Sequence, residues 1–150
     1  MNNIDRLKMK NKTIILSIHP RHVKKILLGE KQYEYRKRIP IDIKHIIVYA
    51  TAPLKKIVAV IEVDTVLKDN PQNIWEQTKN ESGISYSFFT NYFSEATTAY
   101  AIKFRSVYKL PTPIDISIIG GVKCAPQAYM YINESLKILC KKFNLNNDKL

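Results

Sequence analysis

Short runs rich in β-branched and aromatic residues recur along this chain, and the connections between them constrain its fold most strongly. The runs fall at residues 13–18, 31–38, 45–50, 56–66, 99–110 and 114–118. Each has the length of one strand, and short turns such as the one at 51–55 leave no room for the crossover helix of a regular βαβ unit. The pattern predicts an α+β fold with a mainly antiparallel sheet or small barrel of about five to six strands.

Helical periodicity marks most of the segments between these runs. Helices are predicted at 20–28, at 71–83, at 85–95 and from 125 to about 144. Pro20 suits the first turn of a helix, and Gly29 supplies the left-handed residue that ends that helix. We predict one domain over residues 13–144, a flexible basic arm at 1–12 and a frayed C-terminus at 145–150.

The chain carries a strong excess of positive charge. Its 150 residues hold 24 Lys and Arg against 13 Asp and Glu, a net charge of +11, and residues 1–45 alone carry 12 basic and 4 acidic side chains. A field of this sign indicates an anionic partner, such as RNA or a nucleotide-like ligand. The alternatives are a generally solvated basic surface and a regulator that binds an acidic protein.

Other features limit the class of protein. Cys124 and Cys140 are too far apart for a redox or zinc motif and indicate free thiols in a cytoplasmic protein. Residues 1–20 lack a signal-peptide cleavage site, and no apolar run approaches the roughly 18 residues of a membrane span. His19 and His22 have helical spacing but no third ligand nearby, so we predict a helix-start pair and expect no metal and no cofactor. The sequence leaves the oligomeric state open, and we expect a monomer.

The segment GEKQYEYRKR is the strongest candidate for a functional site. From Lys31 onward, alternation places Tyr33 and Tyr35 on one face of a strand and Glu34 and Arg36 on the other. The glutamate and the arginine can fix each other while spare guanidinium donors face a phosphate or a base edge, and the lysine can reach the same cleft. The alternative is an ordinary surface ion pair. We predict that the tyrosines pack in the core, with base stacking as the alternative.

The same segment resembles a known family. Gly29, Lys31, Glu34 and Arg36 match the GxKxxExR motif of the ASCH (activating-signal-cointegrator homology) domain, and matching stretches extend the resemblance over roughly residues 13–135. The chain is similar to the small single-domain bacterial or phage members. The resemblance implies a PUA-like β-barrel with flanking helices, and a cleft beside the motif that takes RNA or nucleoside ligands.

The resemblance also implies an enzymatic alternative. Some small relatives look like amidohydrolases that deacetylate an acetylated cytidine with the motif lysine, a threonine and a glutamate from the helical segment. Here these places correspond to Lys31, to Glu34 instead of the threonine and to Glu81, which are the catalytic candidates if the chain is an enzyme. A carboxylate in place of the hydroxyl removes the nucleophile or relay of hydrolysis. A metal-independent ribonuclease on the same residues is the other enzymatic alternative.

We therefore predict a protein that binds RNA, a nucleotide or a nucleoside in a basic cleft around the motif. A regulatory role is consistent with this prediction. The predicted ligand-binding residues are Lys31, Glu34, Arg36, Arg38, Tyr49 and Gln127.

Overall fold

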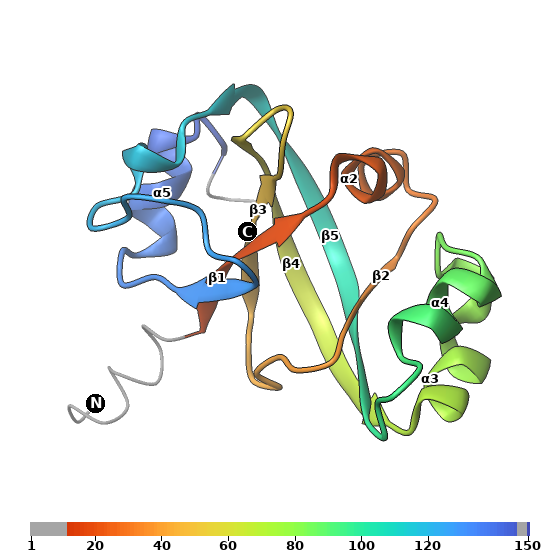
Figure 1. Ribbon diagram of the computed structural model, residues 1–150. Coiled ribbons are helices and arrows are strands. Elements are labelled where there is room, and N and C mark those ends of the chain that lie inside the picture. The colour runs from red at the N-terminus through yellow and green to blue at the C-terminus, as the bar shows by residue number, and fades with distance from the viewer. Residues whose placement is uncertain (1–11, 147–149) are drawn as a thin grey trace, which may run out of the picture.

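The computed structural model describes residues 12–146 and 150, which form strands and helices in mixed order (Figure 1). In chain order the elements are β1 (Thr13–Ile18), α2 (Pro20–Leu27), β2 (Tyr33–Arg36), β3 (His45–Ala50), β4 (Lys56–Asp69), α3 (Pro71–Thr78), a 3-10 helix (Lys79–Glu81), α4 (Tyr86–Tyr92), β5 (Ala99–Ile114), a second 3-10 helix (Ile116–Ile118), β6 (Tyr129–Tyr131) and α5 (Leu136–Lys142). The predicted α+β class is confirmed.

The strands of the described residues form one six-stranded sheet in the order β2-β5-β4-β3-β1-β6. β1 and β3 run parallel, and every other neighbouring pair is antiparallel. Register shifts, for example between Val63 and Thr65, bend the long strands and curl the sheet into a half-barrel. The expectation of a small barrel-like sheet with mostly antiparallel strands and flanking helices is confirmed.

The two longest strands, β4 and β5, connect two halves of the molecule. At one end of this strand pair, β4 pairs with β3, which is followed in the sheet by β1 and β6. At the other end, β5 pairs with β2, and the helices α3 and α4 lie nearby. Figure 1 shows α5 and the α3–α4 pair on opposite sides of the molecule. Strand β2 therefore lies where the α3–α4 pair meets the rest of the sheet.

Apolar side chains fill both faces of the sheet. In β1, Ile14 and Leu16 pack in a cluster with α2, while Ile15 packs in a second cluster with α5, so this strand is buried on both sides. A third cluster joins Tyr33 and Tyr35 of β2 to the aromatic residues of α4. The prediction that these two tyrosines pack in the core is confirmed.

The helix predicted from residue 125 is wrong in its first half. Tyr129–Tyr131 form strand β6, which pairs with β1, and α5 begins only after Ser135, whose Oγ accepts a hydrogen bond from the N–H of Ile138 at 3.3 Å. The apolar spacing misled the prediction because it continues through Ser135. It carries no information about the open edge of β1, whose backbone groups bond to β6.

The strand predicted at 114–118 is also wrong. Pro111 and Pro113 lie inside β5 instead of separating two strands. The register against β4 shifts between Lys109 and Ile114, so the residues between them have no Cα partner in β4 and the prolines interrupt no ladder bond. The chain then turns into the second 3-10 helix.

The predicted domain boundaries fall at the limits of the described residues. Of the arm predicted at 1–12, only Lys12 lies within them. Of the predicted C-terminal segment, residues 147–149 lie outside, and Leu145 and Leu150 pack against the cluster of α5. Both boundaries stay predictions. Over the part of the chain that the structure describes, no helix has the length and apolar character needed to cross a membrane.

Candidate functional site

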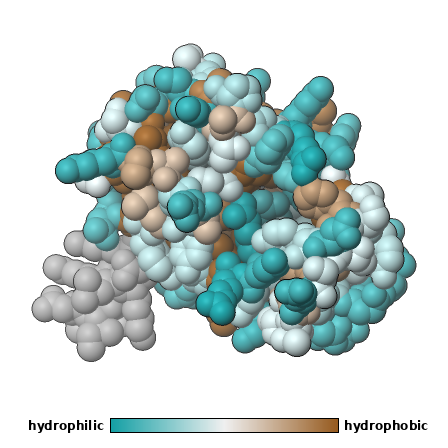
Figure 2. Space-filling view, viewed as in Figure 1, coloured by the Kyte–Doolittle hydropathy of each residue, from teal (hydrophilic) through white to brown (hydrophobic). Residues whose placement is uncertain are grey.

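A cleft of roughly 280 Å³ lies between the start of α2, strand β2 and helix α4. Its lining residues are His19, Arg21, His22, Lys31, Glu34, Tyr35, Arg36, Ile84, Phe88, Phe89, Tyr92 and Phe93. In Figure 2 hydrophilic residues gather along the boundary between the α3–α4 side, at the lower right, and the rest of the molecule. The cleft joins the motif strand to segments that are distant in the sequence.

Lys31 is almost completely buried, with 1% of its side chain exposed. Gly29, at φ +79°, ends α2 and turns the chain toward β2. The Lys31 Nζ donates to the carbonyl oxygen of Ser82 at 2.9 Å and lies 3.7 Å from Oε1 of Glu34 and 4.9 Å from the ring centre of Tyr35. Burial lowers the pKa of Lys31, although the Glu34 carboxylate opposes this effect.

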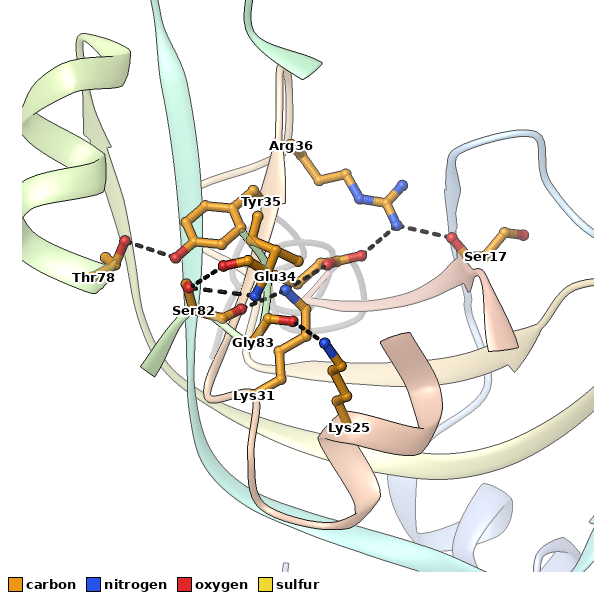
Figure 3. A network of polar contacts seen from close by, with 10 residues as sticks. Ser17, Lys25, Lys31, Glu34, Tyr35, Arg36, Thr78, Ser82 and Gly83 are labelled. Carbon is orange, nitrogen blue, oxygen red and sulfur yellow. Dashed lines mark hydrogen bonds and ion pairs between the residues drawn. The ribbon is translucent and has the colours of Figure 1, made fainter. Parts of the chain in front are cut away.

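Glu34 lies between two cations (Figure 3). The Arg36 Nη2 donates to Oε2 of Glu34 at 2.8 Å and to the carbonyl oxygen of Ser17, at the end of β1, at 2.8 Å. Burial alone would raise the pKa of Glu34, but Arg36 and Lys31 favour the charged form and hold that pKa below its ordinary value. Glu34 is therefore a carboxylate at neutral pH.

Two lysines hold the corner between α3 and α4. Lys25 Nζ donates to the carbonyl oxygen of Gly83 at 2.9 Å, beside the bond from Lys31 to Ser82. Gly83 has φ +69°, and a Cβ atom there would lie 2.5 Å from the Cβ of Lys31. Only glycine allows this close approach. The corner sets where α4 begins, and with it the aromatic side of the cleft.

Helix α4 supplies an aromatic wall. Phe88 and Tyr92 are half-buried and line the cleft, with Phe89 buried behind them. The Arg21 guanidinium carbon lies 4.8 Å from the ring centre of Phe88, and the His22 ring lies 5.3 Å from it in an edge-on arrangement. Because both rings are only half-buried, their exposed parts can contact a planar ligand.

His22 enters the cleft from α2. Burial is the main cause that lowers its pKa to about 4, with help from the charges of Lys31 and Arg21 and against the opposing charge of Glu34. The imidazole is therefore neutral at pH 7, with one nitrogen that donates and one that accepts. Tyr35 also lines the cleft; burial raises its pKa to about 12, and its hydroxyl donates to Thr78 Oγ1 at 2.7 Å.

The cleft thus combines a carboxylate, a guanidinium group, a neutral imidazole and two accessible aromatic rings. These are groups that can stack on a planar ring and bond to its polar edge or to a phosphate. Within residues 12–146 and 150, no group of three or more His, Cys, Asp or Glu side chains is arranged to hold a metal ion.

The structure brings together three of the predicted site residues, Lys31, Glu34 and Arg36. Glu34 and Arg36 lie on the face of β2 that the alternation predicted, and Lys31 precedes the strand. All three are buried or nearly so and do not lie on an open surface. The interpretation as an ordinary surface ion pair therefore does not describe them.

The other predicted site residues lie apart from these three. Glu81 is exposed and does not line the cleft, although its carbonyl oxygen accepts from the N–H of Gln32. Arg38 lines a neighbouring groove, Tyr49 is buried in the cluster of α5, and Gln127 is exposed before β6. The roles predicted for these residues stay predictions.

Several residues of the cleft were not predicted as site residues. The helix-start interpretation holds for His19, whose Nδ1 accepts from the N–H of Arg21 at 3.1 Å and so caps α2. It did not show that His22 and Arg21 face the motif strand. The aromatic residues of segment 85–95 were visible in the sequence, but nothing local indicated that Phe88 packs against α2.

Comparisons of the sequence with known proteins find two kinds of relative. No family model matches the chain. An ASCH domain-containing ribonuclease from Zymomonas mobilis is 27% identical over 96 residues, which cover 61% of this chain and 65% of the relative. The large ribosomal subunit protein uL22 of Ureaplasma parvum is 27% identical over 122 residues, which cover 80% of this chain and 39% of that protein. The chain therefore spans less than two thirds of either relative.

Solved structures show the same fold. The crystal structure of ASCH from Zymomonas mobilis is 24% identical in sequence and has a TM-score of 0.75, with 88% of this chain and 93% of that chain covered. The six-stranded half-barrel with its flanking helices is thus shared with that protein.

Proposed function

We propose that this chain, which shares its fold with the solved ASCH structure, is an ASCH-domain protein that binds RNA or a nucleotide through the cleft between α2, β2 and α4. A base stacks against Phe88 and Tyr92, and its polar edge bonds to Glu34 and Arg36. The observation that carries the proposal is the meeting, in one cleft, of accessible aromatic rings with charged groups that retain unused hydrogen-bonding capacity. The cytoplasmic location expected from the sequence belongs to the same proposal.

The unused capacity lies on both partners of the short ion pair. Arg36 makes its bonds to Glu34 and to Ser17 through Nη2, and 16% of its side chain is exposed, so its remaining donors can bond to a phosphate or a base. On Glu34, Oε1 lies 3.7 Å from Nζ of Lys31, which is longer than a hydrogen bond. That oxygen can accept from an exocyclic amine.

The charge of the chain favours an anionic ligand. The net charge is +11, and Arg21 and Arg36 both lie in the cleft lining. The ribonuclease name of the Zymomonas mobilis relative supports RNA as the ligand class. A basic surface that meets an acidic protein is the alternative, and it offers no role for the aromatic wall.

The test uses two aromatic residues on the same helix. Phe88→Leu removes a ring that lines the cleft, whereas Tyr86→Leu removes an exposed ring that does not. Because stacking contributes about 1–3 kcal/mol per base, the first variant should bind a short fluorescent single-stranded RNA about 5- to 150-fold more weakly in anisotropy titrations. The second should bind like wild type. Equal weakening in both, or no binding by wild type, would exclude the cleft as the site.

Cleavage of RNA is a second candidate, favoured by the neutral His22 in the cleft. Its imidazole can take a proton from a 2′-hydroxyl whose oxygen attacks the phosphate, and Arg36 can stabilise the charge there. The bond to the 5′-oxygen then breaks, which leaves a 2′,3′-cyclic phosphate, and the imidazolium or water returns a proton to the leaving 5′-oxygen. A pKa of about 4 makes His22 a weak base at pH 7, which is why binding is the preferred proposal. Labelled RNA that wild type cuts in the presence of a chelator, and that His22→Gln leaves intact, would make the metal-independent ribonuclease the leading function.

Deacetylation of an acetylated cytidine is the weaker enzymatic alternative. Glu34 takes the place of the threonine, and its lowered pKa makes it a poor general base. Glu81 is exposed outside the cleft lining. We therefore expect little turnover by wild type in a chromatographic assay. Efficient turnover that disappears in Glu81→Gln would overturn the binding proposal.

A further inference from the structure

A second hollow, which we call the basic groove, lies beside the cleft where β2 ends. Its volume is roughly 440 Å³. Its main lining residues are Lys37, Arg38, Lys68, Thr97, Thr98 and Tyr100. The carboxylate among its lining residues is Glu95, so cations outnumber anions there. The groove thus offers an anion several positive charges and three hydroxyl groups.

The basic groove adjoins the cleft. Lys37 Nζ lies 5.1 Å from the ring centre of Tyr92, which lines the cleft. Across the sheet, Arg36 of β2 pairs with Tyr100 of β5, and Tyr100 pairs with Lys68 of β4. Paired residues of antiparallel strands point to the same face, so these three side chains form a row that leads from the cleft into the groove.

The cations of the groove are not neutralised by neighbouring acids. Among the described residues, Lys37, Arg38 and Lys68 are exposed and take part in no ion pair. By contrast, Lys103 and Arg105, farther along the same sheet, both pair with one carboxylate. A phosphate that enters the groove therefore has no ion pair to displace before it bonds to these side chains.

We propose that the basic groove binds the sugar-phosphate backbone of an RNA strand whose base occupies the cleft. This inference rests on the proposed function and deepens it, because the ligand becomes an oligonucleotide that runs from the cleft past Tyr92 to Lys68. Lys37 and Arg38 bond to phosphates of this strand, whereas the Glu95 carboxylate repels the phosphates. Contacts of this type hold a strand in register without reading its sequence.

The test compares two variants that lose the same charge. The groove variant combines Lys37→Ala, Arg38→Ala and Lys68→Ala, and the control variant combines Lys123→Ala, Lys137→Ala and Lys141→Ala, which are exposed cations near the α5 side. Each protein is titrated with a short single-stranded RNA at several salt concentrations and, separately, with adenosine monophosphate. Because each phosphate contact adds about 0.7 to the salt slope, the groove variant should lose about 2 from that slope and bind the RNA about tenfold more weakly.

The mononucleotide separates the two proposals. Adenosine monophosphate has a base for the cleft but no further nucleotide to reach the groove, so the groove variant should bind it as wild type does, and the control variant should keep the RNA salt slope of wild type. Loss of RNA binding in both variants to the same degree, or an unchanged slope in the groove variant, would overturn the groove. Failure of wild type to bind either ligand would overturn the proposed function instead.

A variant that gains affinity provides a further test, because misfolding cannot produce such a gain. Glu95→Gln removes the carboxylate of the groove, so it should strengthen RNA binding at low salt by several-fold and leave binding of adenosine monophosphate unchanged. Unchanged or weaker RNA binding would count against the groove. A parallel titration with a polyglutamate peptide tests whether the groove binds acidic proteins instead. The proposal fails if this peptide binds wild type as tightly as the RNA does and binds the groove variant more weakly.

Discussion

Two ion clusters, each of one carboxylate, one lysine and one arginine, lie on or beside one sheet and differ mainly in burial. In the buried cluster, Glu34 lies 3.7 Å from Lys31 and 2.8 Å from Arg36. The exposed fractions of these side chains are 8%, 1% and 16%. Water is therefore almost excluded from the lysine and the carboxylate, and each depends on protein groups for its bonds.

The exposed cluster consists of Asp64 of β4 with Lys103 and Arg105 of β5. Its distances are nearly the same, 3.8 Å to the lysine and 3.0 Å to the arginine, but 36% to 60% of each side chain is exposed. Such pairs contribute about 0 to 1 kcal/mol, because water and salt screen them. Removing one partner of a buried pair costs far more, since the other charge is left without solvent. Ion pairs with similar distances thus contribute unequally to the stability of the fold.

The largest effect is expected when the buried carboxylate is neutralised. Glu34→Gln leaves the Lys31 ammonium without its counter-charge, so unfolding in urea should show a loss of about 3–5 kcal/mol. Asp64→Asn is the matched change in the exposed cluster and should cost less than about 1 kcal/mol. Similar losses in the two variants would mean that the buried cluster is solvated in solution.

A smaller loss is expected when the buried lysine is replaced. Lys31→Met keeps most of the packing of the long side chain, and Glu34 keeps Arg36, so the main loss is the donor to the buried carbonyl oxygen of Ser82. This should cost about 1–3 kcal/mol, against less than about 0.5 kcal/mol for Lys103→Met. Increased stability of Lys31→Met would show instead that desolvation of the ammonium outweighs its contacts.

Acid should affect the buried region through His22. Its pKa is about 4 in the folded protein, below the ordinary 6.5, so between these values the unfolded chain binds a proton that the folded chain does not. The stability that the neutral imidazole provides is present above pH 6.5 and falls as the pH approaches 4. The free energy of unfolding, measured from pH 7 to pH 4, should decrease less in His22→Gln than in wild type. Parallel pH profiles would contradict the shift.

The sequence predicted the fold better where patterns are local than where elements meet. Alternation and helical spacing located most strands and the helices near 20, 71 and 85. The errors arose where a distant partner decided the structure: Tyr129–Tyr131 become a strand because they reach the edge of β1, and Pro111 is accommodated in β5 by a register shift against β4. Neither partner can be read from the local pattern.

The site was predicted in part for the same reason. The motif placed Glu34 and Arg36 on one face, since period two fixes the side of a strand to which a residue points, and it placed Lys31 just before the strand, within reach of the same cleft. The two-residue period does not determine how deeply a side chain is buried. The three are buried because the start of α2 and the segment around Gly83 close over them, and these contacts, such as Lys25 to Gly83, span 58 residues of sequence.

The smallest effect is expected within the exposed cluster, and it completes the comparison. Asp64 lies at a register shift of β4, between Val63 and Thr65, so it has no paired residue in β5 and its carboxylate can reach both cations of that strand. A double-mutant cycle with Asp64→Asn and Arg105→Gln should therefore give a coupling energy of about 0.2–1 kcal/mol at low salt. Because the Debye length falls to about 3 Å at 1 M salt, the coupling should nearly vanish there. A coupling energy above about 2 kcal/mol that persists in salt would mean that the exposed pair is as strong as the buried cluster. Burial would then not explain why the two clusters differ in energy.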